Sequence, residues 1–236
     1  MSIRRGPELP YSVVAGVVPF SRGWLVASAK SQGSNFAPEP PKTYATFLDV
    51  LDERPTFAAI VIYAPIGYRN TPDDGPRKCD VQARALLGVR GAAIRNAPSR
   101  AVLSGAVDWR EGRVDAVTAM MLPKYREVAV EMSPFRQRVV YEGNPELSFY
   151  ELIHETPLGY SKLREMGREE RLEILLDRMP GIAKVTEAEL PGVQKKHLYD
   201  AAALLSTARR VQGRAAKRLP DEAEWDSDGV RMEIVY

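Results

Sequence analysis

A nearly continuous apolar run, Phe57 to Ala64, places the strongest constraint on the fold. Apolar side chains at almost every position indicate a strand that is buried on both faces, and such strands occur mainly in sheets covered by helices on both sides. The run ends at Pro65-Ile66-Gly67, which interrupts regular structure. The pattern therefore predicts an α/β domain in which residues 57–64 form a central strand.

Two runs rich in β-branched residues precede this strand, Tyr11 to Val18 and Gly23 to Ala29. They predict an antiparallel hairpin whose four-residue loop is Pro19-Phe20-Ser21-Arg22. Thr43 is a candidate cap for a following helix with inward positions at helical spacing: Tyr44, Phe47, Leu48 and Leu51. A right-handed crossover through that helix would make residues 57–64 parallel to the first strand.

Apolar spacing predicts further elements toward the C-terminus. They are a helix from Asp80 to about Gly88, a strand from Ala101 to Val107, helices from Ser161 to Arg178 and from Lys195 to Lys217, and a terminal strand from Val230 to Tyr236. Residues 108–138 form an irregular region, in which Val114 to Met121 has helical character. Basic residues gather at the end of the Lys195 helix, namely Arg209, Arg210, Arg214, Lys217 and Arg218. We interpret them as a solvated helix end that suits the helix dipole, with a nucleic-acid patch as the alternative.

Composition excludes several classes of protein. The 236 residues are 44% hydrophobic and 27% charged, which is typical of a globular chain, and we expect one domain over residues 1–236. The net charge of +2 gives no bulk electrostatic case for nucleic acid. One cysteine excludes an internal disulfide, and two histidines make a histidine-rich metal site implausible. Without a long apolar run or a signal-like N-terminus, we expect a cytoplasmic protein with no membrane segment.

Two carboxylates bracket a turn within the stretch Val139 to Phe149. A short apolar strand leads into Gly-Asn-Pro, so that Glu142 lies at the end of the strand and Glu146 lies just beyond the turn. Ligands usually meet an open α/β sheet at such strand ends. Glu142 and Glu146 are therefore the leading site candidates, against the alternative of a solvated strand end and a helix cap.

Several separated motifs occur along the chain in one order. They are Gly16 with Gly23-Trp24-Leu25-Val26, Ala64-Pro65-Ile66-Gly67, Arg77-Lys78-Cys79-Asp80 with Ala83-Arg84 and Leu87-Gly88, Pro98-Ser99-Arg100, Glu142 with Asn144-Pro145-Glu146-Leu147-Ser148-Phe149, Ser161-Lys162, and Asp200-Ala201. In this order they resemble the predicted RNase H-like nucleases of a widespread bacterial family. The resemblance covers almost the whole chain and implies an RNase H-like, five-stranded mixed sheet flanked by helices.

The resemblance also implies a metal site, and this sequence departs from it. RNase H-like nucleases hold two divalent ions about 4 Å apart, and hard cations such as Mg²⁺ require carboxylate oxygens. In the family pattern one aspartate lies in the first strand and another precedes Pro-Ile-Gly, but here those positions are Val18 and Tyr63. Glu142, Glu146 and Asp200 remain. The resemblance therefore implies a fold whose two central metal ligands have been lost.

Three interpretations follow from this loss. In the first, the protein is a pseudo-nuclease that acts as a binding or scaffold protein, without a metal cofactor and with nucleic acid or another protein as partner. In the second, it is an enzyme that uses Glu142, Glu146 and Asp200. It is then either a one-metal nuclease or phosphohydrolase, with Mg²⁺ or Mn²⁺ weakly held at Glu142 and Asp200, or an enzyme that does acid/base work without metal. In the third, these carboxylates are structural and function lies on another surface.

Other residues in the matched motifs have a binding and a structural interpretation. Arg77, Arg84 and Arg100 are candidates to bind an anionic group, and arginines that tie loops to Asp80 or to helix ends are the alternative. Tyr63 is a candidate to stack on a base or a small ligand, or it is part of the core. We interpret Cys79 as a small buried residue. Asp200 lies in a largely apolar helix, where its carboxylate needs a partner that either a metal or an arginine could supply.

Overall fold

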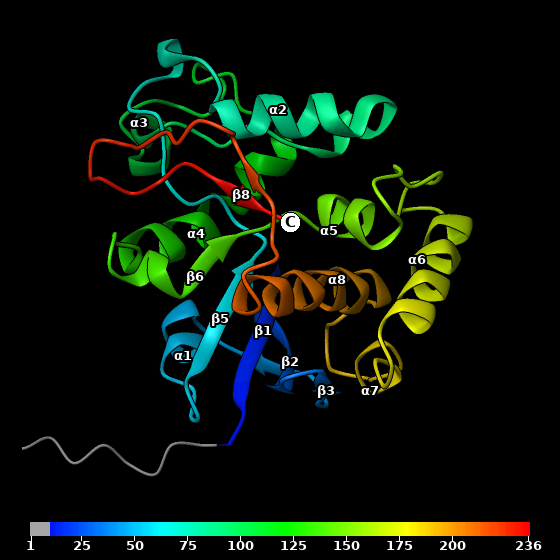
Figure 1. Cartoon of the computed structure of the whole chain (residues 1–236). Coiled ribbons are helices and arrows are strands. Elements are labelled where there is room, and N and C mark those ends of the chain that lie inside the picture. The colour runs from blue at the N-terminus through cyan, green and yellow to red at the C-terminus, as the bar shows by residue number, and fades with distance from the viewer. Residues whose placement is uncertain (1–9) are drawn as a thin grey trace, which may run out of the picture.

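A six-stranded mixed sheet forms the centre of the computed structural model, which describes residues 10–236 (Figure 1). The strand order is β3-β2-β1-β5-β6, and the short β4 pairs with β2 on the side where β3 also pairs. The strands are β1 (Ser12–Phe20), β2 (Gly23–Gln32), β3 (Asn35–Pro38), β4 (Lys42–Tyr44), β5 (Phe57–Ile62) and β6 (Val140–Glu142). β1 and β2 are antiparallel, whereas β5 is parallel to both β1 and β6. The predicted hairpin and the predicted parallel pairing are both confirmed.

Helices cover both faces of the sheet, and the alternation of side chains along β1 decides which residues meet which helix. Val14 and Val18 share a buried cluster with α8, while Val13, Ala15 and Val17 share another with α1. The α-helices are α1 (Phe47–Leu51), α2 (Lys78–Leu87), α3 (Arg100–Ser104), α4 (Ala116–Glu131), α5 (Pro145–Leu152), α6 (Glu165–Arg178), α7 (Ala183–Thr186) and α8 (Lys195–Gln212). In Figure 1, α8 crosses directly over β1. The long α8 is therefore the element against which the central strand packs.

The C-terminal segment returns to the middle of the molecule (Figure 1). β8 (Ile234–Val235) pairs with β7 (Arg218–Leu219) in a separate two-stranded sheet, and Val235 also bridges to Gly143 just beyond β6. A terminal strand was predicted over Val230 to Tyr236, and the structure shortens it to two residues. The chain end thus lies beside the turn that carries the two candidate glutamates.

Capping explains one difference from the sequence prediction. Thr43 lies in β4 and does not cap α1, whereas Thr46 caps α1 by accepting a hydrogen bond from the backbone nitrogen of Asp49. The expected five-stranded sheet consequently gains a sixth strand. The hairpin loop is also tighter than predicted, because Phe20 pairs directly with Gly23.

Two predictions in the middle of the chain are wrong or incomplete. Residues 101–107 were predicted as a strand, but Arg100–Ser104 form the short helix α3, which Ser99 caps at its start. The irregular region 108–138 contains the 16-residue helix α4, which extends well past the predicted Val114 to Met121. α4 buries only Thr118, Leu122 and Val128, so its apolar positions are too sparse for a clear helical period.

Within residues 10–236, no helix combines the length and the apolar character needed to cross a membrane.

Candidate functional site

The sequence-predicted carboxylates come from three elements that meet at one edge of the sheet. Glu142 ends β6, Glu146 lies in the first turn of α5, and Asp200 lies on α8. Tyr63 follows the end of β5, and its backbone nitrogen donates to the carbonyl oxygen of Val17 over 2.8 Å. Because β1, β5 and β6 are mutually parallel, their carboxyl ends lie at the same edge, as expected for a site in an open α/β sheet.

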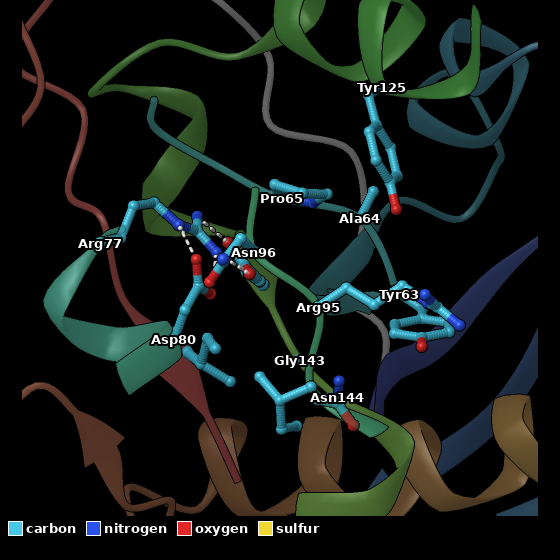
Figure 2. A pocket seen from close by; sticks show the side chains of 13 residues that line it. Tyr63, Ala64, Pro65, Arg77, Asp80, Arg95, Asn96, Tyr125, Gly143 and Asn144 are labelled. Atoms are coloured by element: carbon cyan, nitrogen blue, oxygen red, sulfur yellow. Dashed lines mark hydrogen bonds and ion pairs between the residues drawn. The ribbon is translucent and has the colours of Figure 1, made fainter. Parts of the chain in front are cut away.

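A small hollow of about 40 Å³ lies at this edge. Tyr63, Tyr125, Glu142 and Arg77 are among the residues that line it. Figure 2 shows Arg77 and Asp80 joined on one side of the hollow, with Tyr63 and Arg95 on the other. The hollow has room for water or a very small ligand, and both polar and apolar groups line it.

Glu142 is held by Arg77 through two hydrogen bonds. The Nη1 and Nη2 atoms of Arg77 lie 2.7 and 2.6 Å from the two carboxylate oxygens of Glu142. The backbone nitrogen of Ile66 donates to the same carboxylate over 2.6 Å. Both side chains are buried, with 2% of Arg77 and 7% of Glu142 exposed. This paired, fork-like geometry is the strongest form of a charge-assisted contact.

The same arginine also binds Asp80. Its Nε and Nη2 atoms lie 3.0 and 2.7 Å from the Asp80 carboxylate, and its Nη1 donates to the backbone carbonyls of Ile66 and Gly67. All three guanidinium nitrogens of Arg77 are therefore engaged by the protein itself. Arg77 was a candidate to bind an external anion, and in the structure its anionic partners are Glu142 and Asp80.

The burial of this group shifts its proton equilibria. Burial raises the pKa of Glu142 to about 7, because the charged form loses its water; the Arg77 cation opposes this shift and the nearby Asp80 carboxylate adds to it. Two carboxylates share one cation here, so the group carries excess negative charge when both are ionised. Protonation of Glu142 near neutral pH relieves that excess.

Glu146 has two arginine partners. Arg171 of α6 approaches one carboxylate oxygen to 2.5 Å, and Arg90 approaches the other to 3.2 Å. Arg171 is completely buried and also donates to the backbone carbonyls of Tyr160 and Gly167. Both Nη atoms of Arg171 therefore have partners, whereas its buried Nε has none among residues 10–236. Glu146 is therefore an internal counter-ion of Arg171 in α6.

Asp200 is paired with Lys162. The Lys162 ammonium lies 2.5 Å from one carboxylate oxygen of Asp200 and 5.3 Å from the centre of the Tyr63 ring. The other carboxylate oxygen of Asp200 is buried and has no hydrogen-bond partner among residues 10–236. Burial raises the pKa of Asp200 against the opposing charge of Lys162. The sequence predicted a metal or an arginine as the partner of Asp200, and the structure pairs it with a lysine, Lys162.

Val18 and Tyr63 occupy positions where the family resemblance implies aspartates. Val18 is 1% exposed and belongs to the buried cluster on the α8 face of the sheet, against which Tyr63 packs. Burial raises the pKa of the Tyr63 hydroxyl, so this phenol is neutral at pH 7. An apolar side chain and a neutral phenol thus stand at the centre of the site.

The other two candidate arginines are engaged elsewhere. Arg100 binds Asp226 and Asp228, each over 2.6 Å. Arg84 reaches the carbonyl oxygen of Ile94 at 3.5 Å. Neither side chain lines the hollow beside Glu142, whereas Arg77 does. Both contacts match the structural interpretation, in which arginines tie loops and helix ends together.

Lys162 and Arg171 are site residues that sequence reasoning did not single out. Lys162 was part of a matched motif, Ser161-Lys162, but its position 38 residues before Asp200 gave no sign of their contact. Arg171 lies in a helix with many charges, and nothing in its spacing distinguishes it from its exposed neighbours. No group of three histidine, cysteine, aspartate or glutamate side chains within residues 10–236 is placed to hold a metal ion.

Comparison with known proteins identifies the family of this chain. The sequence model of the family described as "Protein of unknown function (DUF429)" matches residues 16–225. The chain belongs to this family. No curated protein and no solved structure shows significant similarity to the chain. The DUF429 match includes every candidate site residue, from Val18 to Asp200.

Proposed function

We propose that this DUF429 protein has an RNase H-like fold whose metal site has been replaced by internal ion pairs, and that it acts as a binding or scaffold protein. The mixed sheet, with an opening hairpin and helices on both faces, agrees with the fold that the sequence resemblance implies. The convergence of Glu142, Glu146 and Asp200 at one edge agrees with the placement of its acidic residues.

The Lys162 to Asp200 ion pair carries this proposal. The Lys162 ammonium contacts the Asp200 carboxylate, which the resemblance assigns to a divalent ion. The same ammonium lies over the ring of Tyr63. A metal would have to displace an internal cation from each remaining carboxylate, since Arg77 also holds Glu142 and two arginines hold Glu146. Two divalent ions add four positive charges, which a site already neutralised by basic side chains repels.

Calorimetric titration and a cleavage assay test this proposal together. We expect the natural protein to show no saturable Mn²⁺ or Mg²⁺ binding, and no Mn²⁺-dependent cleavage of single-stranded, duplex or hybrid substrates. A triple variant, Val18→Asp with Tyr63→Asp and Lys162→Ala, provides the two missing carboxylates and removes the competing ammonium. We expect that variant to gain saturable Mn²⁺ binding.

The control is the double variant Glu142→Ala with Glu146→Ala. If the natural protein binds Mn²⁺ and this double variant does not, the carboxylates hold a metal after all. Cleavage by the natural protein that disappears on Glu142→Ala would likewise refute the pseudo-nuclease proposal. Circular dichroism should accompany each variant, because Val18 is buried and a charge there lowers stability.

A second candidate function rests on the pKa of Glu142. A carboxyl group with a pKa of about 7 beside a hollow is well matched to general acid/base work at neutral pH. If Glu142 acts as a base, we expect a metal-independent activity on a small substrate that rises with pH through about 7 and is lost in Glu142→Gln. A pH profile that is unchanged in this variant would exclude Glu142 as the base.

A further inference from the structure

A groove lies beside Tyr141 of β6, the last strand of the sheet. It consists of two hollows of about 420 and 460 Å³ that share Tyr141 and Arg218 as lining residues. We call it the β6 groove and define it by Arg138, Tyr141, Arg214, Arg218, Trp225 and Arg231. The groove also reaches Ala58 and Ala59 at the start of β5, whereas Tyr63 and the candidate site lie beyond the other end of that strand. The β6 groove is therefore separate from the carboxylate site.

Four of the six defining residues are arginines, and no carboxylate lines either hollow. Glu233 pairs with Arg218 over 2.6 Å and lies 3.7 Å from Arg231. Arg138 and Arg214 have no carboxylate partner among the described residues. A chain with a net charge of only +2 thus concentrates positive charge in one groove, which favours an anionic ligand.

The acidic residues next to Trp225 in the sequence pair with arginines that do not line the groove. Asp226 and Asp228 pair with Arg100, and Glu224 pairs with Arg69. Trp225 lies among them in the sequence but lines the groove, and 56% of it is exposed. The loop thus presents its aromatic ring on the groove side while its carboxylates are held by other arginines.

Aromatic rings lie against two of the arginines. The Arg218 guanidinium lies 5.4 Å from the centre of the Tyr141 ring, and Arg138 lies 5.5 Å from that of Phe135. Phe135 is 73% exposed, and Trp225 is similarly open. Exposed aromatic rings gathered beside guanidinium groups are informative, because contiguous exposed apolar surface usually marks an interaction site.

We propose that the β6 groove binds single-stranded nucleic acid, with the arginines on backbone phosphates and the rings of Trp225 and Tyr141 stacked on bases. Guanidinium groups bind phosphate oxygens in a fork, and single-strand sites combine such a cationic groove with aromatic stacking platforms. An acidic peptide would use the charges but not the rings. A duplex keeps its bases stacked on one another and cannot offer them to Trp225. Arg214 and Arg218 belong to the basic cluster that the sequence left as a solvated helix end or a nucleic-acid patch; α8 ends at Gln212, and both arginines line this groove.

Fluorescence anisotropy with labelled DNA and RNA strands of about twelve nucleotides tests the charge requirement. We expect the double variant Arg138→Glu with Arg214→Glu to weaken binding at least about tenfold at about 50 mM salt, and to reduce the dependence of the affinity on salt. The matched control is Arg168→Glu with Lys196→Glu. It changes the net charge equally, but it lies at the opposite end of α8, where these residues line another hollow. We expect the control to bind almost as tightly as the natural protein.

Variants of Trp225 test the stacking requirement without changing charge. We expect Trp225→Ala to weaken binding about 5- to 100-fold with an unchanged salt dependence, and Trp225→Phe to restore most of the affinity. Strand binding should also quench the fluorescence of the exposed Trp225; of the other two tryptophans, Trp24 is fully buried and Trp109 is partly buried against another cluster.

Other outcomes would overturn the proposal. Equal weakening in the control variant would indicate bulk attraction of an anion to the whole surface. Binding of heparin or an acidic peptide that equals strand binding, with Trp225→Ala having no effect, would make the groove a general polyanion or acidic-peptide surface. Tighter binding of a duplex than of either strand would exclude base stacking. These results do not depend on metal binding or cleavage, so the proposal can fail while the proposed function stands.

Discussion

Replacement of Arg77 by methionine is expected to lower the free energy of unfolding by about 3 to 5 kcal/mol near pH 8. The variant would leave the carboxylates of Asp80 and Glu142 buried without their shared cation. It would also remove the donor to the carbonyl oxygens of Ile66 and Gly67. Breaking a buried ion pair by removing one partner is costly because the other charge remains without water or a counter-ion. Urea unfolding of the natural protein and the variant measures this difference.

The loss should depend on pH, with a sign set by Glu142. Its folded-state pKa of about 7 lies above the ordinary value of a glutamate, so the stability due to its neutral form is present at low pH and is lost as pH rises through 7. Without Arg77 the ionised form of Glu142 is destabilised further, so the pKa of Glu142 should rise further. The difference between natural protein and variant should therefore be largest above pH 7 and should shrink toward about pH 5.

Two further variants separate charge from packing. Arg84→Met lies on the same helix as Asp80 but loses only a long contact to the carbonyl of Ile94, so we expect a change within about 1 kcal/mol. Adding Glu142→Gln to Arg77→Met removes one uncompensated charge and should recover part of the stability near pH 8. A loss in Arg77→Met that is below about 1 kcal/mol, or that is the same at both pH values, would contradict this account of the Arg77 contacts.

Sequence patterns predicted the strands in which nearly every consecutive residue is buried. The strands β1, β2 and β5 are almost entirely buried, so their apolar runs are long and clear. The prediction failed where local signals were weak. α3 has only five residues with strand-like Val102 and Leu103, and its identity depends on the Ser99 cap and on Gly105, which ends it with a φ of +85°.

The candidate site could be predicted only as a set of residue types at one strand edge. Glu142 and Glu146 flank a turn that the sequence makes plain, but the partners that decide their chemistry are distant. Arg77 lies 65 residues before Glu142, and Arg171 lies 25 residues after Glu146. Pairs of this kind arise from tertiary packing, and a single sequence carries no record of them. The absence of aspartates at Val18 and Tyr63 was visible, whereas the presence of Lys162 over the Tyr63 ring was not.

Substitution of alanine for Gly16 is expected to be strongly destabilising, because it places a methyl group against backbone atoms. Gly16 lies in the middle of β1, where a Cβ atom would be 2.2 Å from the carbonyl oxygen of Ala201 and 2.3 Å from the backbone nitrogen of Leu205. Both obstacles are backbone atoms of α8, so no side-chain rotation can relieve the clash. The helix would have to move away from the central strand.

The cost of that movement follows from what α8 covers. It buries eleven residues, among them Asp200, and it shields the α8 face of β1, β2 and β5. Overpacking of a core usually costs about 1 to 3 kcal/mol when side chains can shift, and more where rigid backbone must move. We therefore expect Gly16→Ala to lose more than about 3 kcal/mol of stability, or to give no cooperative unfolding transition. The displacement of α8 should also separate Asp200 from Lys162.

A matched substitution separates the clash from the general effect of replacing glycine. At Gly213, beyond the end of α8, the nearest atom to an added Cβ is the carbonyl oxygen of Arg209 at 3.4 Å, which is ordinary contact. We expect Gly213→Ala to change the free energy of unfolding by less than about 1 kcal/mol. If Gly16→Ala unfolds at the same urea concentration as Gly213→Ala, then α8 does not pack on β1 as closely as described, and the placement of Asp200 at the sheet edge would lose its physical basis.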